Sequence, residues 1–119
     1  MGRKDDIHPV DPTRQLPGDE VADVFRRIGR GEVPFEPAEV GRRWGADDPG
    51  TYAIRVGGYE IILFNDNGSV DYVEKAIAPD GRKGSFRFWI DRGQEPVQRM
   101  GPDDVAALEA RLTARLRHR

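Results

Sequence analysis

The sequence predicts an α+β fold: a four-stranded antiparallel meander flanked by an N-terminal and a C-terminal helix, in the order α-β-β-β-β-α. Three observations predict it. Two runs of β-prone residues flank Gly57-Gly58, a pair suited to the positive φ angles of a two-residue hairpin turn. Apolar residues recur at helical spacing before and after this region. Turn-forming residues also separate two further strand-like runs.

The first helix is expected over residues 19–30. Its apolar residues follow the i, i+3, i+4, i+7 spacing of one buried stripe, namely Val21, Val24, Phe25 and Ile28. Acidic residues open the segment and arginines close it, which suits the helix dipole. Gly29 and Gly31 offer C-terminal stops.

The hairpin over residues 51–64 has a register that its turn predicts. The paired residues on one face are Val56 with Tyr59, Ile54 with Ile61 and Tyr52 with Leu63. All six side chains share that face because directly opposed residues lie on the same side of a sheet. On the other face Arg55 lies opposite Glu60, and this opposite-charge pair supports the register.

The remaining elements follow from shorter patterns. A turn at residues 65–68 leads into a third strand over residues 70–77, and a turn at residues 79–81 leads into a fourth strand over residues 85–91. In that strand Phe86, Phe88 and Ile90 would share one face, with Arg87 and Trp89 on the other. The last helix begins at Pro102 and buries a stripe of Val105, Leu108, Leu112 and Leu116. Both helices are expected on the Tyr52 face of the sheet.

Two segments lack such patterns. Residues 1–17 combine proline and charge and are expected to form a flexible N-terminal arm, which leaves residues 18–119 as a single α+β domain. Residues 32–50 are rich in proline and glycine, with a possible short helical turn near residues 37–44. Whether residues 32–50 cover the outer face of the sheet is left open by the sequence.

Composition narrows the function classes. The chain has 119 residues, a net charge of −2 and no cysteine, which excludes disulfides, thiolate metal sites and cysteine nucleophiles. No apolar run approaches the roughly 20 residues of a membrane span, and no signal peptide is evident. We therefore expect a cytoplasmic protein that needs no cofactor and contacts no membrane.

Catalytic and metal sites find little support. Both histidines, His8 and His118, lie near the ends of the chain. Residues 65–68 look like part of a calcium loop, but Leu63 occupies the position where that loop needs a carboxylate. No phosphate-binding glycine motif or nucleophile elbow is present. We expect no enzymatic activity.

Residues 82–88 superficially resemble the aromatic strand of an RNA-recognition motif, which would favour nucleic-acid binding. Ser85 shifts Phe86 and Phe88 to the opposite parity, so both are expected in the core. We expect no binding of nucleic acid.

A protein-binding surface remains. The outer sheet face would carry aromatic and arginine side chains, which are frequent at interface hot spots. Acidic residues near the turns would add charge. The residues expected to contact a partner are Asp66, Asp71, Glu74, Asp80, Arg87 and Trp89. The alternative for Trp89 is a place in a second, minor core.

The motifs Phe64-Asn-Asp66, Asp71-Tyr72 and Pro79-Asp-Gly-Arg82, together with the apolar strand before them, resemble a family of small bacterial domains of unknown function. The similarity spans residues 21–116. The chain departs from the pattern at Tyr59, where tryptophan is expected, and in having no cysteine near the third strand. The resemblance implies a fold and no activity.

Size, acidity and layout are also similar to those of bacterial toxin-immunity proteins, a likeness of class. The leading hypothesis is therefore a non-enzymatic immunity protein that neutralises a cognate protein toxin, possibly a nuclease. The alternatives are a nucleic-acid-binding regulator and a small-molecule-binding domain.

Overall fold

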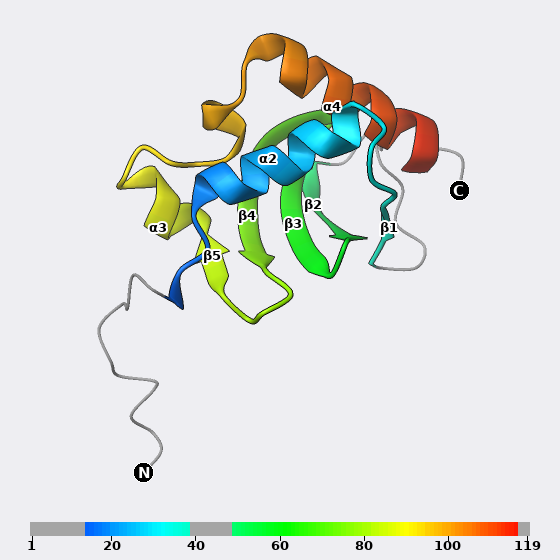
Figure 1. Cartoon of the computed structure of the whole chain (residues 1–119). Coiled ribbons are helices and arrows are strands. Elements are labelled where there is room, and N and C mark those ends of the chain that lie inside the picture. The colour runs from blue at the N-terminus through cyan, green and yellow to red at the C-terminus, as the bar shows by residue number, and fades with distance from the viewer. Residues whose placement is uncertain (1–13, 39–48, 117–119) are drawn as a thin grey trace.

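In the computed structural model, two helices pack on one face of a five-stranded antiparallel sheet (Figure 1). The structure describes residues 14–38 and 49–116. Helix α2 spans Gly18–Gly29 and helix α4 spans Pro102–Leu116. The strands are β1 (Glu36–Pro37), β2 (Gly50–Val56), β3 (Tyr59–Asp66), β4 (Ser69–Ile77) and β5 (Lys83–Ser85), which pair in that order. A short helix α3 (Phe86–Ile90) and a 3-10 turn η2 (Val97–Arg99) connect β5 to α4.

The β2–β3 hairpin confirms the predicted register. Val56 pairs with Tyr59, Ile54 with Ile61, Tyr52 with Leu63 and Arg55 with Glu60. Gly57 and Gly58 have φ angles of 54° and 85°, the double left-handed turn that joins tightly twisted strands. The side chains of Tyr52, Ile54, Ile61 and Leu63 are buried in the core that the two helices cover. The placement of both helices on this face is therefore confirmed.

Helix α2 ends in a left-handed glycine. The N–H of Gly31 donates to the carbonyl oxygen of Ile28, and the N–H of Glu32 donates to that of Arg27, both at 2.9 Å. Gly31 has a φ angle of 74°, so this is a Schellman motif with glycine at its left-handed position. Gly29 lies against α4, where a β-carbon would meet that of Ala107 at 3.1 Å.

The expected fourth strand over residues 85–91 is wrong beyond its first residue. Only Lys83–Ser85 pairs with β4, and the hydroxyl of Ser85 then accepts the N–H of Phe88 at 3.3 Å as the N-cap of α3. This turn reverses the expected parity. Trp89 is fully buried, and Phe86 and Phe88 are only partly buried. Ser85 followed by aromatic residues is compatible with a helical turn as well as with a strand. The burial of Trp89 in the core favours the helical turn.

The strand count was also too low. Strand β1 pairs Glu36 with Arg55 and Pro37 with Ile54 at the edge of the sheet. A strand of two residues, one of them a proline, is too short to show the alternation of apolar and polar residues that predicts a strand. Such short edge strands are typical of natural sheets. The helical turn expected near residues 37–44 is wrong at its start, because Pro37 lies in β1 and the N–H of Ala38 donates to the carbonyl oxygen of Ala53 at 2.9 Å. Residues 39–44 lie outside the described residues.

The arm expected over residues 1–17 contributes its last residues to the fold. Leu16 is fully buried, and its N–H donates to the carbonyl oxygen of Lys83 at 2.9 Å. Gln15 forms a parallel bridge with Lys83. The boundary of the domain therefore precedes residue 18, and residues 1–13 lie outside the described part of the chain.

Candidate functional site

Strand β4 carries two β-bulges, and each brings an expected partner-binding carboxylate to the surface. Between Ile62 and Leu63 the pairing skips Glu74, and between Phe64 and Asn65 it skips Asp71. Both skipped residues are exposed, as is Asp66 at the end of β3. Within residues 14–38 and 49–116, none of these three carboxylates takes part in an ion pair. A β-bulge changes the direction of the side chain at the extra residue and interrupts the regular pairing, so Asp71 and Glu74 have no cross-strand neighbour directly opposite.

Two glutamates fasten the bulged strand from the helix side. A carboxylate oxygen of Glu95 accepts the N–H of Val73, and one of Glu109 on α4 accepts the N–H of Val70, both at 2.8 Å. Glu95 is 1% exposed, and its other oxygen accepts the N–H of Gln98 at 2.9 Å. Charged acceptors thus satisfy backbone donors that the bulges leave without a strand partner.

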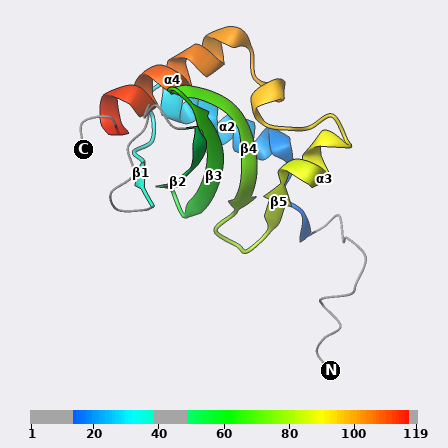
Figure 2. The ribbon, with the colours of Figure 1, turned by 180° about the vertical axis from the view of Figure 1, so that it is seen from behind.

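The outer face of the sheet carries a row of three aromatic rings. The rings of Phe64 and Tyr72 stack with centroids 5.2 Å apart, and those of Tyr72 and Phe86 tilt against each other at 4.7 Å. All three side chains are half-buried. Helices α2 and α4 lie behind the sheet when it is viewed from this side (Figure 2), so no described helix covers the row. Burial, and then the charges of Glu74 and Asp71, raise the pKa of Tyr72.

We name this surface the acidic–aromatic face: the rings of Phe64, Tyr72 and Phe86 with the carboxylates of Asp66, Asp71 and Glu74. Sequence reasoning placed Phe86 in the core and left Tyr72 out of the site. The Asp71-Tyr72 pair within an alternating strand was the available signal, but the bulges that expose it involve long-range pairing.

Two other expected contacts lie elsewhere. Trp89 is inside the core, where its indole N–H donates to the carbonyl oxygen of Leu16 at 2.8 Å. A β-carbon at Gly84 would clash with the Trp89 ring, so only glycine at this position lets the ring pack against the strand. Trp89 therefore belongs to the core, and the expectation that it contacts a partner is wrong. Arg87 is exposed on α3.

Asp80 is separated from the other carboxylates because it follows the opposite end of β4. Both of its oxygens accept Arg82 Nε, at 3.0 and 2.9 Å. The two terminal nitrogens of Arg82 donate to Glu20 at 2.9 and 2.8 Å, and the Tyr59 hydroxyl donates to Glu20 at 2.5 Å. This clasp (Glu20, Tyr59, Asp80 and Arg82) joins the start of α2 to two hairpin turns.

Charge pairing sets the pKa values in the clasp. The hydrogen bonds from Arg82 lower the pKa of Glu20 and that of Asp80. Burial, and then the bond to Glu20, raise the pKa of Tyr59 to about 12. A neutral tyrosine and two ionised carboxylates on one guanidinium are satisfied partners, so the clasp is suited to holding the turns and not to proton transfer.

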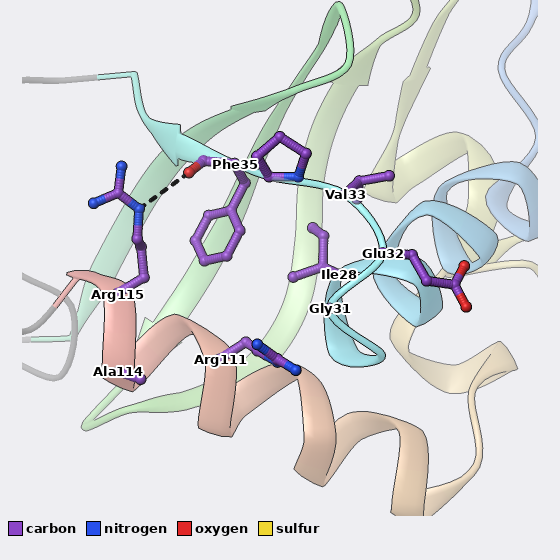
Figure 3. Close-up of a pocket in the computed structure, with 9 residues that line it drawn as sticks. Ile28, Gly31, Glu32, Val33, Phe35, Arg111, Ala114 and Arg115 are labelled. Atoms are coloured by element: carbon purple, nitrogen blue, oxygen red, sulfur yellow. Dashed lines mark hydrogen bonds between the residues drawn. The ribbon is translucent and has the colours of Figure 1, made fainter.

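A pocket of about 580 Å³ opens on the helix side, between the segment that follows α2 and the last turns of α4 (Figure 3). It is lined by Ile28, Gly31, Glu32, Val33, Pro34, Phe35, Arg111, Ala114 and Arg115. Neither Arg111 nor Arg115 is among the residues that the sequence assigned to a site. Arg111 and Arg115 lie next to the apolar side chains of the pocket only because residues 31–35 run alongside α4, a path that no local pattern predicts.

The described residues contain no group of three or more His, Cys, Asp or Glu side chains placed to hold a metal ion. Among the described helices, none is both long enough and apolar enough to cross a bilayer.

Comparison with known proteins gave one match. Searches of curated proteins and of solved structures found no significant similarity. One family model, described as "Domain of unknown function (DUF7693)", matches residues 15–114. Its first residue coincides with the start of the Gln15–Lys83 bridge, so the match includes the segment that carries the buried Leu16. Because the match covers most of the chain, the protein belongs to this family of domains of unknown function.

Proposed function

We propose that this chain is a non-enzymatic, cytoplasmic binding protein of the bacterial toxin-immunity type, which blocks a cognate toxin through its acidic–aromatic face. One observation supports this most: three free carboxylates border a half-exposed row of aromatic rings on a face that no described helix covers. Aromatic anchors supply binding energy at protein interfaces, and surrounding charges select the partner and speed the encounter.

The face is also held in place by hydrogen bonds and ring contacts. Glu95 and Glu109 fasten β4 on its inner side, and mutual stacking limits the motion of the rings. A surface that is ordered before binding loses less conformational entropy on association. A strand and rings held in this way suit an inhibitor that presents carboxylates to a basic surface, such as the substrate cleft of a nuclease.

A second candidate is binding of single-stranded nucleic acid. Lys75 and Lys83 lie on the same side of the sheet as the rings, and exposed aromatics on a sheet can stack on bases. The observed packing favours the protein partner. Phe64 and Tyr72 lie almost parallel, with an interplanar angle of 14°, so each ring already covers a face that a base would need.

The test first expresses the reading frames that neighbour the gene and takes a product that is toxic to cells as the cognate toxin. Charge variants of this protein are then compared in its presence. Asp71→Lys should slow association by about threefold to tenfold, with the difference shrinking at high salt. Asp103→Lys, an equal charge change at the start of α4, is the matched control and should associate at the wild-type rate. Tyr72→Ala should accelerate dissociation by about tenfold or more, because it removes the central ring.

Cell survival on co-expression gives the functional readout, and association and dissociation rates come from surface plasmon resonance. Equal rates for Asp71→Lys and Asp103→Lys would remove the acidic–aromatic face from the interface. Salt-sensitive, micromolar binding of mixed RNA or DNA by the isolated protein would overturn the immunity proposal in favour of nucleic-acid binding.

A further inference from the structure

The pocket beside α4 combines an apolar floor with two guanidinium groups. Ile28 is buried beneath it, and Val33 and Phe35 pack partly against the core while their remaining surface lines the cavity. Figure 3 shows the Phe35 ring projecting into the space between its own segment and α4. A volume of about 580 Å³ lies in the range typical of small-molecule sites.

The positive charge comes from one turn of α4. Arg111 and Arg115 are four residues apart, so both lie on the same side of the helix. Arg115 Nε donates to the carbonyl oxygen of Phe35 at 3.3 Å, which leaves its two terminal nitrogens available. Arg111 lies against Gly31, where a β-carbon would meet Nη2 at 2.5 Å. Within the described residues, Arg111 has no ion-pair or hydrogen-bond partner.

The acidic residue in the lining does not cancel this charge. Glu32 accepts Arg30 Nε at 2.7 Å, and that hydrogen bond lowers the pKa of the Glu32 carboxyl. The carboxylate therefore stays ionised and is paired with an arginine outside the pocket. Two like charges one helical turn apart repel each other, and a shared anion would relieve that repulsion.

We propose that this pocket binds a small organic carboxylate with an apolar body, held by Arg111 and Arg115 and seated on Phe35, Val33 and Ile28. Guanidinium groups match carboxylate geometry with paired hydrogen bonds. The apolar floor favours an aromatic or branched body over an inorganic anion. This site lies on the helix side of the sheet, away from the acidic–aromatic face, so it is independent of the proposed immunity function.

The probe is 3-phenylpropionate, titrated into the full ¹⁵N-labelled chain while backbone amide shifts are followed. We expect saturable shifts in residues 31–35 and 111–115, with a dissociation constant of about 1 mM for so small a ligand. The matching neutral amide, 3-phenylpropanamide, should bind about tenfold more weakly, because it lacks the charge that the guanidiniums recognise. Inorganic phosphate should produce no saturable shift in residues 31–35.

Variants separate the charge from the floor. Arg111→Gln and Arg115→Gln should each weaken binding about tenfold, and Arg87→Gln, an exposed arginine on α3, should change it less than about twofold. Ala114→Trp places a large ring in the cavity from an exposed helix position and should abolish binding while the other amide shifts stay wild-type.

Three results would overturn the proposal. The amide could bind as tightly as the acid, both glutamine variants could bind as tightly as the wild type, or no saturable shift could appear up to about 10 mM. Saturation by phosphate equal to that by 3-phenylpropionate would reject the apolar body and leave only an anion site.

Discussion

Replacing Glu95 with glutamine should destabilise the protein far more than its conservative shape suggests. The two carboxylate oxygens of Glu95 each accept one backbone N–H, from Val73 at 2.8 Å and from Gln98 at 2.9 Å. An amide of the same shape has only one oxygen, so its nitrogen would face one of these donors. Because the side chain is 1% exposed, water cannot replace the lost acceptor.

The magnitude follows from the bonds removed. A hydrogen bond to a charged group contributes about 1.5–3 kcal/mol, and a buried donor without an acceptor costs a similar amount. We expect Glu95→Gln to lower the free energy of unfolding by about 2–3 kcal/mol, a large part of the stability of a small domain. Glu74→Gln, at the neighbouring exposed bulge position, should change it by less than about 0.5 kcal/mol.

Urea denaturation followed by circular dichroism measures both variants, with unchanged m values as the check that the same two-state transition is compared. The Val73 amide proton should also move upfield in Glu95→Gln, because it loses a charged acceptor. A loss below about 0.5 kcal/mol for Glu95→Gln would refute the reasoning, since it would mean that the N–H left facing the amide nitrogen finds another partner.

Further predictions concern the clasp and the end of α2. The lowered pKa values of Glu20 and Asp80 mean that Arg82 contributes stability above their unfolded values and loses it as pH falls through the folded ones. Arg82→Gln should therefore flatten the decline in stability as the pH falls below the unfolded pKa values of Glu20 and Asp80, as measured by urea midpoints. A decline parallel to that of the wild type would contradict the clasp. Gly31→Ala should cost about 1–2 kcal/mol for its positive φ angle. Gly93→Ala is its control, because Gly93 also has a positive φ angle but has no atom within 4 Å of its added β-carbon. If Gly31→Ala loses more unfolding free energy than Gly93→Ala, the difference reports the Arg111 guanidinium packed against Gly31.

Local patterns in the sequence determined the β2–β3 hairpin and both long helices. The Gly57-Gly58 turn sets the register of its own strands, because a two-residue loop leaves one way to pair them. The stripe of α2 and its glycine stop depend on residues within a few positions of one another. The exposure of Asp66 at the end of β3 followed from its polarity.

Tertiary packing decided the rest. Residues 85–89 fit a strand and a helical turn equally well, and Trp89 resolved the ambiguity by packing against Gly84 and donating to Leu16, far away in the chain. The bulges that free Asp71 and Glu74 depend on Glu109 and Glu95, whose role no nearby residue signals. Local propensity cannot encode such contacts, because their free energy arises only when distant segments exclude water together.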